Sequence, residues 1–224
     1  MVNIMKIVSE AKEADINSLI AIMTGDGKTE LKVLNSLARR YNGTSIGFFL
    51  PALPFHFRPG TALSALKAIK VYLSKYAVTH SLCLIDREFF NDEDQETILR
   101  NIISAFGGIG ISIKNTEALE ESIEIALILR GELAGQRTIV SYLAINGRSD
   151  GERRIEDDIA ELIRLELGEE VNPNRSAIRN TLRRYGTDVP ALIQGASNRN
   201  LALAFPSLVC IMRNIEVRTH FPWL

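Results

Sequence analysis

The stretch "IAIMTGDGKTELKVL", residues 20–34, decides the fold because an apolar run gives way first to glycines and then to a helix-like segment. Residues 18–23 are a continuous apolar run, as expected for a strand buried on both faces. Residues 30–41 carry leucines on one helical face and predict an amphipathic helix. Asp26 stands between two glycines at the junction. A carboxylate at this point requires a chemical explanation.

Further strands and helices are predicted by the same alternation along the chain. Apolar runs predict strands over 45–50, 80–85, 109–113 and 138–145. Periodic segments predict helices over 62–76, 95–106 and 117–130. Alternating strands and helices with short connections are typical of a parallel sheet covered by helices on both faces. The fold class is therefore α/β.

The pattern changes after the last predicted strand. The segments 151–170, 174–186, 189–196 and 200–215 all have helical periodicity, with no strand between them. We expect an α/β domain over residues 1–148 and a helical subdomain over residues 149–224.

Composition limits the classes of partner. The chain has 224 residues and a net charge of -1, so any binding of a polyanion must come from a local patch. The N-terminus lacks an apolar core of signal-peptide length, and no later apolar run is long enough to span a bilayer. Cys83 and Cys210 have no metal-type spacing and are interpreted as buried thiols. These features predict a soluble, cytoplasmic protein without membrane association.

Carboxylates follow two of the predicted strands. Asp26 follows the first strand, and Asp86 and Glu88 follow the strand over 80–85. In open parallel sheets, ligands bind beyond the carboxyl ends of the strands. Neighbouring carboxylates repel one another unless a cation lies between them, and Mg²⁺ prefers oxygen ligands. The sequence therefore predicts a Mg²⁺ site, with Lys28 at the following helix start as a candidate phosphate contact.

These two motifs resemble those of the Toprim superfamily. "GDGKTE", residues 25–30, is similar to the acid-Gly-x-Thr-acid turn that opens many Toprim domains, and "LIDREFF", residues 84–90, is similar to their acid-x-acid strand end. The similarity covers roughly residues 16–130 and is nearest in style to the OLD-type defence nucleases. No recognisable context for a topoisomerase tyrosine is present, and helicase and zinc segments of a full primase are lacking.

The resemblance implies a Mg²⁺ or Mn²⁺ site and cleavage or transfer at a phosphodiester. Asp26 would take the place of the family's first glutamate, which acts in general acid-base catalysis. Asp86 and Glu88 would take the place of its metal-binding acid pair. Asp26 is one methylene shorter than the usual residue and Glu88 one methylene longer, so the two changes are expected to compensate.

Two further sets of residues are candidates for the site. Glu117 comes closest after the strand over 109–113 and would join the acidic site, as a glutamate does in nuclease-like Toprim proteins. Arg175, Arg179 and Arg183 recur every four residues and form a positive stripe on one helix face. The stripe is either a contact for a nucleic-acid backbone or an ion-pair seam with the acidic helix over 156–170.

The hypothesis that follows is a Mg²⁺-dependent nuclease of Toprim type that acts on DNA or RNA. The alternative is a non-catalytic Toprim-like protein that binds a nucleotide or a partner in a defence or regulatory complex. The choice among DNA, RNA and nucleotide stays open, as do homo-oligomerisation and the biological pathway.

Overall fold

The computed structural model describes residues 7–8, 18–23, 28–40, 47–49, 63, 66–75, 79–90, 94–119, 125–147 and 154–220. The strands are β1 (Ile7–Val8), β2 (Ser18–Met23), β3 (Gly47–Phe49), β4 (His80–Asp86), β5 (Ile111–Ala118), β6 (Ala126–Leu133) and β7 (Arg137–Asn146). The helices are α1 (Lys28–Arg40), α2 (Leu66–Lys75), α3 (Gln95–Gly108), α4 (Ile155–Leu167), α5 (Arg175–Arg184), α6 (Val189–Gly195), α7 (Asn198–Ala204) and α8 (Pro206–His220).

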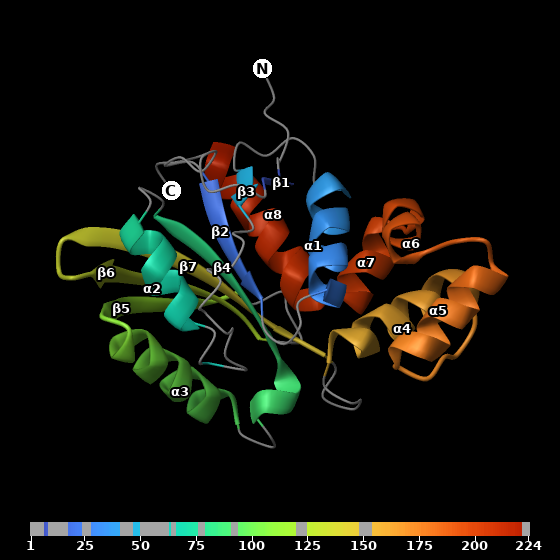
Figure 1. The fold of residues 1–224 in the computed structure, drawn as a ribbon, viewed down its shortest axis with the longest axis horizontal. Helices are drawn as coiled ribbons and strands as arrows, with labels where there is room; N and C mark the ends of the chain where they lie inside the picture. The colour runs from blue at the N-terminus through green and yellow to red at the C-terminus, as the bar shows by residue number, and fades with distance from the viewer. Residues whose placement is uncertain are drawn as a thin grey trace.

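The described strands form one mixed sheet in the order β1-β3-β2-β4-β7-β6-β5 (Figure 1). The neighbouring pairs β1–β3, β3–β2, β2–β4 and β4–β7 are parallel. Strand β6 runs antiparallel to both β7 and β5. The α/β class is confirmed. The wholly parallel sheet predicted from the sequence is corrected to a mixed one.

The source of this correction is the segment predicted as a helix over 117–130. That prediction is wrong, because residues 126–133 form strand β6, which pairs with β5 and β7. Residues 126–129 are all buried, as in a strand covered on both faces. Gly131 is required there, since a Cβ atom would lie 2.6 Å from the carbonyl oxygen of Ser112 on β5. The glutamates that precede the apolar run gave this segment a helix-like composition.

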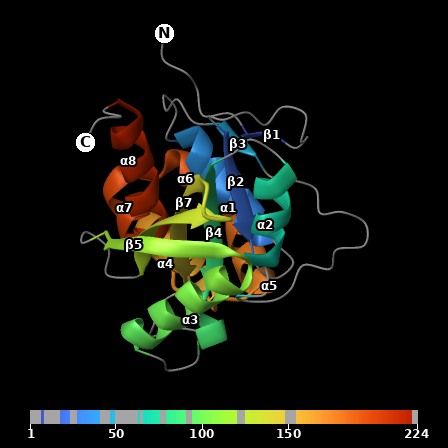
Figure 2. The same cartoon turned by 90° about the vertical axis from the view of Figure 1, so that its left-hand side faces the viewer.

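Helices cover both faces of the sheet, as predicted. One hydrophobic cluster joins β4, β6 and β7 to α2 and α3. The other cluster joins the opposite face of the same strands to α1 and α4–α8. Figure 2 views the sheet from the β5 edge and shows α2 and α8 on opposite sides of it. The helices that follow residue 149 therefore share one core with α1 and the sheet.

Alternate residues of β4 face these two clusters. Leu82 and Leu84 pack with the α1 side, whereas Cys83 and Ile85 pack with the α2 side. The alternation places the next residue, Asp86, on the side of α1 and α4. The carboxyl end of β4 is thus directed toward the first turns of two helices.

Candidate functional site

Asp86 is the centre of a group of acidic side chains. It ends β4 and is 6% exposed. Burial is the largest cause that raises the pKa of its carboxyl to about 8, because the charged form loses water. The negative charges of three glutamates contribute to this rise, in the order Glu30, Glu156 and Glu88. The backbone N–H of Ile155 donates to the carboxyl and opposes the rise.

Two of these glutamates lie in the first turns of helices. Glu30 of α1 is 3% exposed and Glu156 of α4 is 6% exposed. A carboxylate in the first turn interacts favourably with the partial positive charge of the helix N-terminus. That interaction offsets part of the cost of burying the two glutamates. Strand β4 and the starts of α1 and α4 together form an acidic cluster, defined here as Glu30, Asp86, Glu88 and Glu156.

The start of α4 is held against the sheet by its own acidic residues. Asp157 Oδ2 accepts from the backbone N–H of Arg154 at 3.0 Å, and Asp158 Oδ2 accepts from the N–H of Gly147 at 3.2 Å. Gly147 directly follows β7. These contacts fix the first turn of α4 at the carboxyl end of the sheet, which places Glu156 near Asp86.

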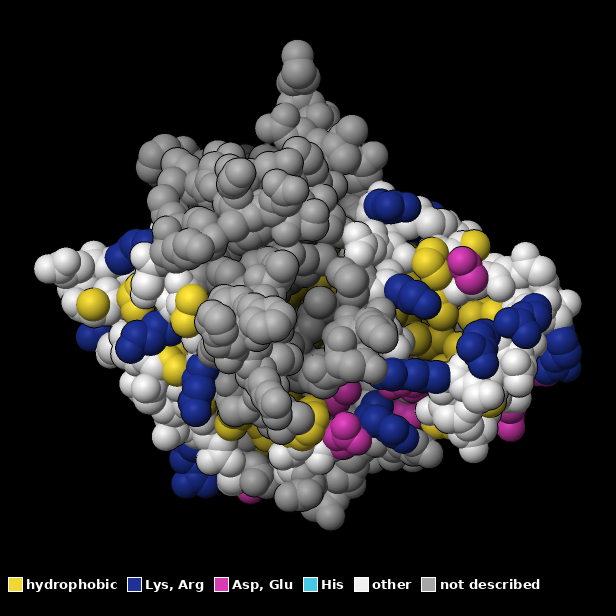
Figure 3. Space-filling model, in the orientation of Figure 1, with side chains coloured by type: hydrophobic (Ala, Val, Ile, Leu, Met, Phe, Trp, Pro, Cys, Tyr) yellow, Lys and Arg dark blue, Asp and Glu magenta, His cyan; other side chains and the backbone are white. Residues whose placement is uncertain are grey.

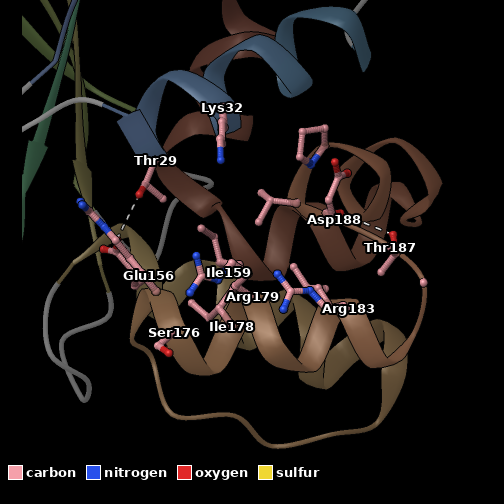
Figure 4. Close-up of a pocket in the computed structure, with 15 residues that line it drawn as sticks. Thr29, Lys32, Glu156, Ile159, Ser176, Ile178, Arg179, Arg183, Thr187 and Asp188 are labelled. Atoms are coloured by element: carbon pink, nitrogen blue, oxygen red, sulfur yellow. Dashed lines mark hydrogen bonds and ion pairs between the residues drawn. The ribbon is translucent and has the colours of Figure 1, made fainter.

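Glu156 has polar partners of its own. Thr29 Oγ1 donates to Glu156 Oε1 at 3.2 Å, and Arg175 Nε donates to the same oxygen at 2.8 Å. Figure 4 shows Thr29 and Glu156 joined in this way at one end of a hollow. The contacts connect α1, α4 and α5 through a single carboxylate.

Glu88 differs from the other members of the acidic cluster. It lies in the 3-10 turn Arg87–Phe90 that follows β4, and its side chain is 41% exposed. Its Oε2 lies 3.7 Å from Arg154 Nε. Glu88 is therefore at the solvent side of the cluster, next to a cation.

Asn146 is a further polar residue at this edge of the sheet. It ends β7, stands opposite Asp86 in the strand register and is 2% exposed. Within the described part of the chain, neither Asn146 Nδ2 nor Asp86 Oδ1 has a hydrogen-bond partner. Unpaired buried polar atoms are uncommon in folded proteins and are candidates for a functional role.

A basic hollow adjoins the acidic cluster. It has a volume of about 720 Å³ and lies between α1, α4, α5 and α6. The three arginines of the predicted stripe, Arg175, Arg179 and Arg183, all line it, together with Lys32 of α1. Figure 3 shows Lys and Arg side chains bordering an apolar patch over these helices, with acidic side chains next to it.

The structure places the predicted site residues in different environments. Asp26 lies outside the described residues, as does the side chain of Lys28, at which α1 begins. Asp86 and Glu88 lie close enough for the charge of Glu88 to contribute to the raised pKa of Asp86. Strands β2 and β4 are parallel neighbours, which is the arrangement that a site shared by Asp26 and Asp86 requires.

Glu117 is not part of the acidic cluster. It lies on β5, and Arg130 Nη2 on β6 is 3.2 Å from its Oε2. Strand β5 is separated from β4 by β6 and β7, which is about 14 Å at the usual strand spacing. Glu117 also pairs in register with Ile128 rather than standing at the level of Asp86.

The donors of the acidic cluster fit a hard cation in their chemistry. Carboxylate oxygens, with the amide oxygen of Asn146, are the ligands that Mg²⁺ takes in proteins. Repulsion that raises the pKa of Asp86 is also what a bound cation would relieve. Among the described residues, however, no group of three or more His, Cys, Asp or Glu side chains is arranged to hold a metal ion. A complete ligand set would need a further contribution.

Sequence reasoning missed Glu30, Glu156 and Asn146. Glu30 is the last acid of the "GDGKTE" motif, and its place in the first turn of the predicted helix was the available signal. Asn146 follows an apolar run in the same way as Asp86 does. Glu156 carries no comparable signal, because its position depends on how α4 packs against the sheet.

Comparisons with known proteins give no family assignment: no protein-family model matches the chain, and neither the curated proteins nor the solved structures include a match. Of the helices in the described part of the chain, none has the length and apolar character needed to cross a membrane.

Proposed function

We propose that this protein is a Mg²⁺-dependent phosphoryl-transfer enzyme that hydrolyses phosphodiester bonds of nucleic acid. The observation that carries the proposal is the position of Asp86. Asp86 ends β4 at the carboxyl edge of the parallel strands, and its buried carboxyl has a pKa raised to about 8. Two buried glutamates lie beside it. Strongly perturbed carboxylates in such a place are typical of catalytic sites.

The finer fold assignment belongs to the same proposal. A Toprim-like domain needs acids after two neighbouring parallel strands that are joined by helical crossovers. Supporting this assignment, β2 and β4 are parallel neighbours, and α1, β3 and α2 lie between them in the chain. Asp26 follows β2 in the sequence, and Asp86 ends β4.

Asp86 and Glu30 would hold the metal ion, with Asp26 as a further ligand or as the general base. A bound Mg²⁺ supplies charge neutralisation at the phosphate that undergoes transfer. Glu156 keeps Arg175 in place through its 2.8 Å ion pair. Arg179, Arg183 and Lys32 line the adjoining hollow, where they would bind substrate phosphates.

The test is a cleavage screen over single- and double-stranded DNA and RNA with Mg²⁺ or Mn²⁺. We expect the wild-type protein to cleave at least one of them and Asp86→Asn to lose about 100-fold or more of that activity. Glu117→Gln is the matched control, since it removes a carboxylate from the same sheet away from the acidic cluster. Loss of activity in both variants to the same degree would contradict the assignment.

A non-catalytic binding protein is the second candidate. It is favoured by the two ion pairs that already compensate acids of the cluster, Arg154 with Glu88 and Arg175 with Glu156. Calorimetric titration with Mg²⁺ separates the two functions. Absence of Mg²⁺ binding, together with absence of cleavage of every nucleic acid tested, would favour the binding protein.

A further inference from the structure

The basic hollow has an apolar floor as well as its cations. Its volume of about 720 Å³ lies in the range of sites that bind small molecules. The apolar side chains that line it are Ile159, Ile178, Leu182, Val189 and Pro190. A site for phosphates alone gains nothing from such a floor, so the shape and lining indicate a ligand with both a charged and an apolar part.

Three cations are directed into this hollow. Figure 4 shows Lys32 extending from α1 toward Arg179 and Arg183, which extend from α5 on the other side. All three are exposed, and within the described part of the chain none of them has an ion-pair partner. Their charges are therefore free to bind an anion.

The acidic residues that line the hollow have other roles. Asp188 accepts a hydrogen bond from the backbone N–H of Ala191 at 2.8 Å and caps α6. Glu156 accepts from Arg175 at 2.8 Å. Against these two carboxylates the hollow is lined by four cations, Lys32, Arg175, Arg179 and Arg183, so its lining carries an excess of two positive charges.

The walls of the hollow are fixed to each other. Arg40 of α1 donates to the backbone carbonyls of Gln194 and Ala196, at 2.9 and 2.8 Å, at the end of α6. Gln194 Nε2 in return donates to the carbonyl of Ser36 at 2.6 Å. Because α1 and α6 are locked together, the hollow is preformed, which lowers the entropic cost of binding a ligand.

We propose that this hollow binds a single unpaired nucleotide, with its phosphate on Arg179, Arg183 and Lys32 and its base on the apolar floor. The inference deepens the proposed function, on which it rests, by naming the part of the substrate that this half of the site holds. The faces of paired and stacked bases in a duplex are covered by neighbouring bases, so the proposed contact with the floor requires a nucleotide that is free or at the end of a single strand. Glu156 lines one end of the hollow, so a strand held there leads toward the acidic cluster.

Equilibrium binding tests the inference without any cleavage. Adenosine monophosphate is titrated into the full chain by calorimetry in EDTA, and inorganic phosphate is titrated in parallel. We expect one nucleotide per chain, bound more tightly than phosphate. Arg179→Ala should weaken nucleotide binding by about tenfold or more, the usual effect of losing a hydrogen bond to a charged group.

Two further variants make the result specific. Arg184→Ala is the matched control, because Arg184 is on the same helix but pairs with Glu169 and does not line the hollow. Its nucleotide affinity should equal that of the wild type. Val189→Thr keeps the shape of the side chain and adds a hydroxyl to the floor. It should weaken binding of the nucleotide and leave binding of phosphate unchanged.

Competition identifies the source of the nucleotide. Displacement of adenosine monophosphate by a short single-stranded oligonucleotide with a terminal phosphate supports a strand end, and failure to displace it supports a free nucleotide. Equal affinities for phosphate and nucleotide, or equal effects of Arg179→Ala and Arg184→Ala, would overturn the inference. If the protein cleaves nucleic acid but does not bind the nucleotide, the inference about the hollow is wrong and the proposed function stands. If it binds the nucleotide but cleaves no nucleic acid, the proposed function is wrong and the inference about the hollow stands.

Discussion

Asp86 and Asn146 stand opposite one another in the register of the parallel strands β4 and β7, so that a buried carboxyl and a buried amide lie side by side where both strands end. In the described part of the chain, Asp86 Oδ1 and Asn146 Nδ2 are both without a hydrogen-bond partner. The carboxyl is held in an environment that disfavours its charge. Its titration is consequently linked to the stability of the fold.

Stability of the metal-free protein should fall as the pH rises from about 4 to about 8. The pKa of Asp86 is raised from 3.8 to about 8, so in this window the folded protein retains a proton that the unfolded chain releases. The free energy of unfolding then decreases by up to about 1.4 kcal/mol per pH unit from this group. Urea unfolding in EDTA across this range measures the slope. Asp86→Asn should reduce this slope and raise the stability at high pH. The control Glu117→Gln should leave the slope unchanged. Equal slopes in wild type and Asp86→Asn would contradict the prediction.

Mg²⁺ should stabilise the protein, and more strongly at high pH. A cation that binds only the folded state at about 100 times its Kd adds roughly 2.7 kcal/mol. For a chain of this size that is a rise in Tm of roughly 5–10 °C. The effect should be smaller near pH 6, because the proton on Asp86 competes with the cation. Thermal unfolding with and without Mg²⁺ measures it. A Tm rise of the same size in Asp86→Asn would place the cation elsewhere.

Much of the alternation of strands and helices could be predicted from the sequence, because most of the apolar runs are long enough to identify their own element. Asp86 could be found for the same reason, since it ends a run buried from Ser81 to Ile85. Strand β6 could not be predicted in this way, because its buried residues follow glutamates. Its pairing with β5 and β7 is a property of the folded sheet. Propensity is outweighed there by the two strands that enclose it.

The acidic cluster could be predicted only in part. Asp86 and Glu88 are close in sequence, so their proximity needs no tertiary information. Glu156 reaches the same place because Asp158 accepts from the N–H of Gly147, a contact between the start of α4 and the end of β7. No local pattern in the sequence indicates that contact. The basic hollow depends in the same way on the packing of α1 against α6.

The arginine stripe should divide into residues with different roles. Arg175 is paired with Glu156, which is 6% exposed, whereas Arg179 and Arg183 are directed into the hollow. Arg175→Ala leaves a buried carboxylate with the hydroxyl of Thr29 and should lower the free energy of unfolding by about 1–3 kcal/mol. Arg179→Ala should change it by less than about 0.5 kcal/mol. Chemical denaturation of the two variants side by side decides this, and adding Glu156→Gln to Arg175→Ala should recover part of the loss. Comparable destabilisation by Arg175→Ala and Arg179→Ala would indicate that the whole stripe is an ion-pair seam.

Glu30 should matter more to the metal site than Glu88 does. Of the charges that raise the pKa of Asp86, that of Glu30 is the largest and that of Glu88 the smallest. Glu30 is 3% exposed, whereas the side chain of Glu88 is 41% exposed and lies 3.7 Å from Arg154. Solvent screens the exposed ion pair of Glu88 with Arg154, so the charge of Glu88 acts only weakly on Asp86. The sequence motif places Glu88 in the acid pair, but the geometry favours Glu30.

Single substitutions of the two glutamates test this preference. Glu30→Gln removes the stronger repulsion, so the pKa of Asp86 should fall. The decline of stability with rising pH should then be complete at a lower pH than in the wild type. The same change should weaken Mg²⁺ binding by about 10-fold or more, as expected for loss of a ligand or of its immediate support. Glu88→Gln should have smaller effects on both. The measurements are the pH dependence of urea unfolding in EDTA and calorimetric titration with Mg²⁺. If Glu88→Gln abolishes Mg²⁺ binding while Glu30→Gln preserves it, the acid pair implied by the motif is the correct one and the buried glutamate has a structural role.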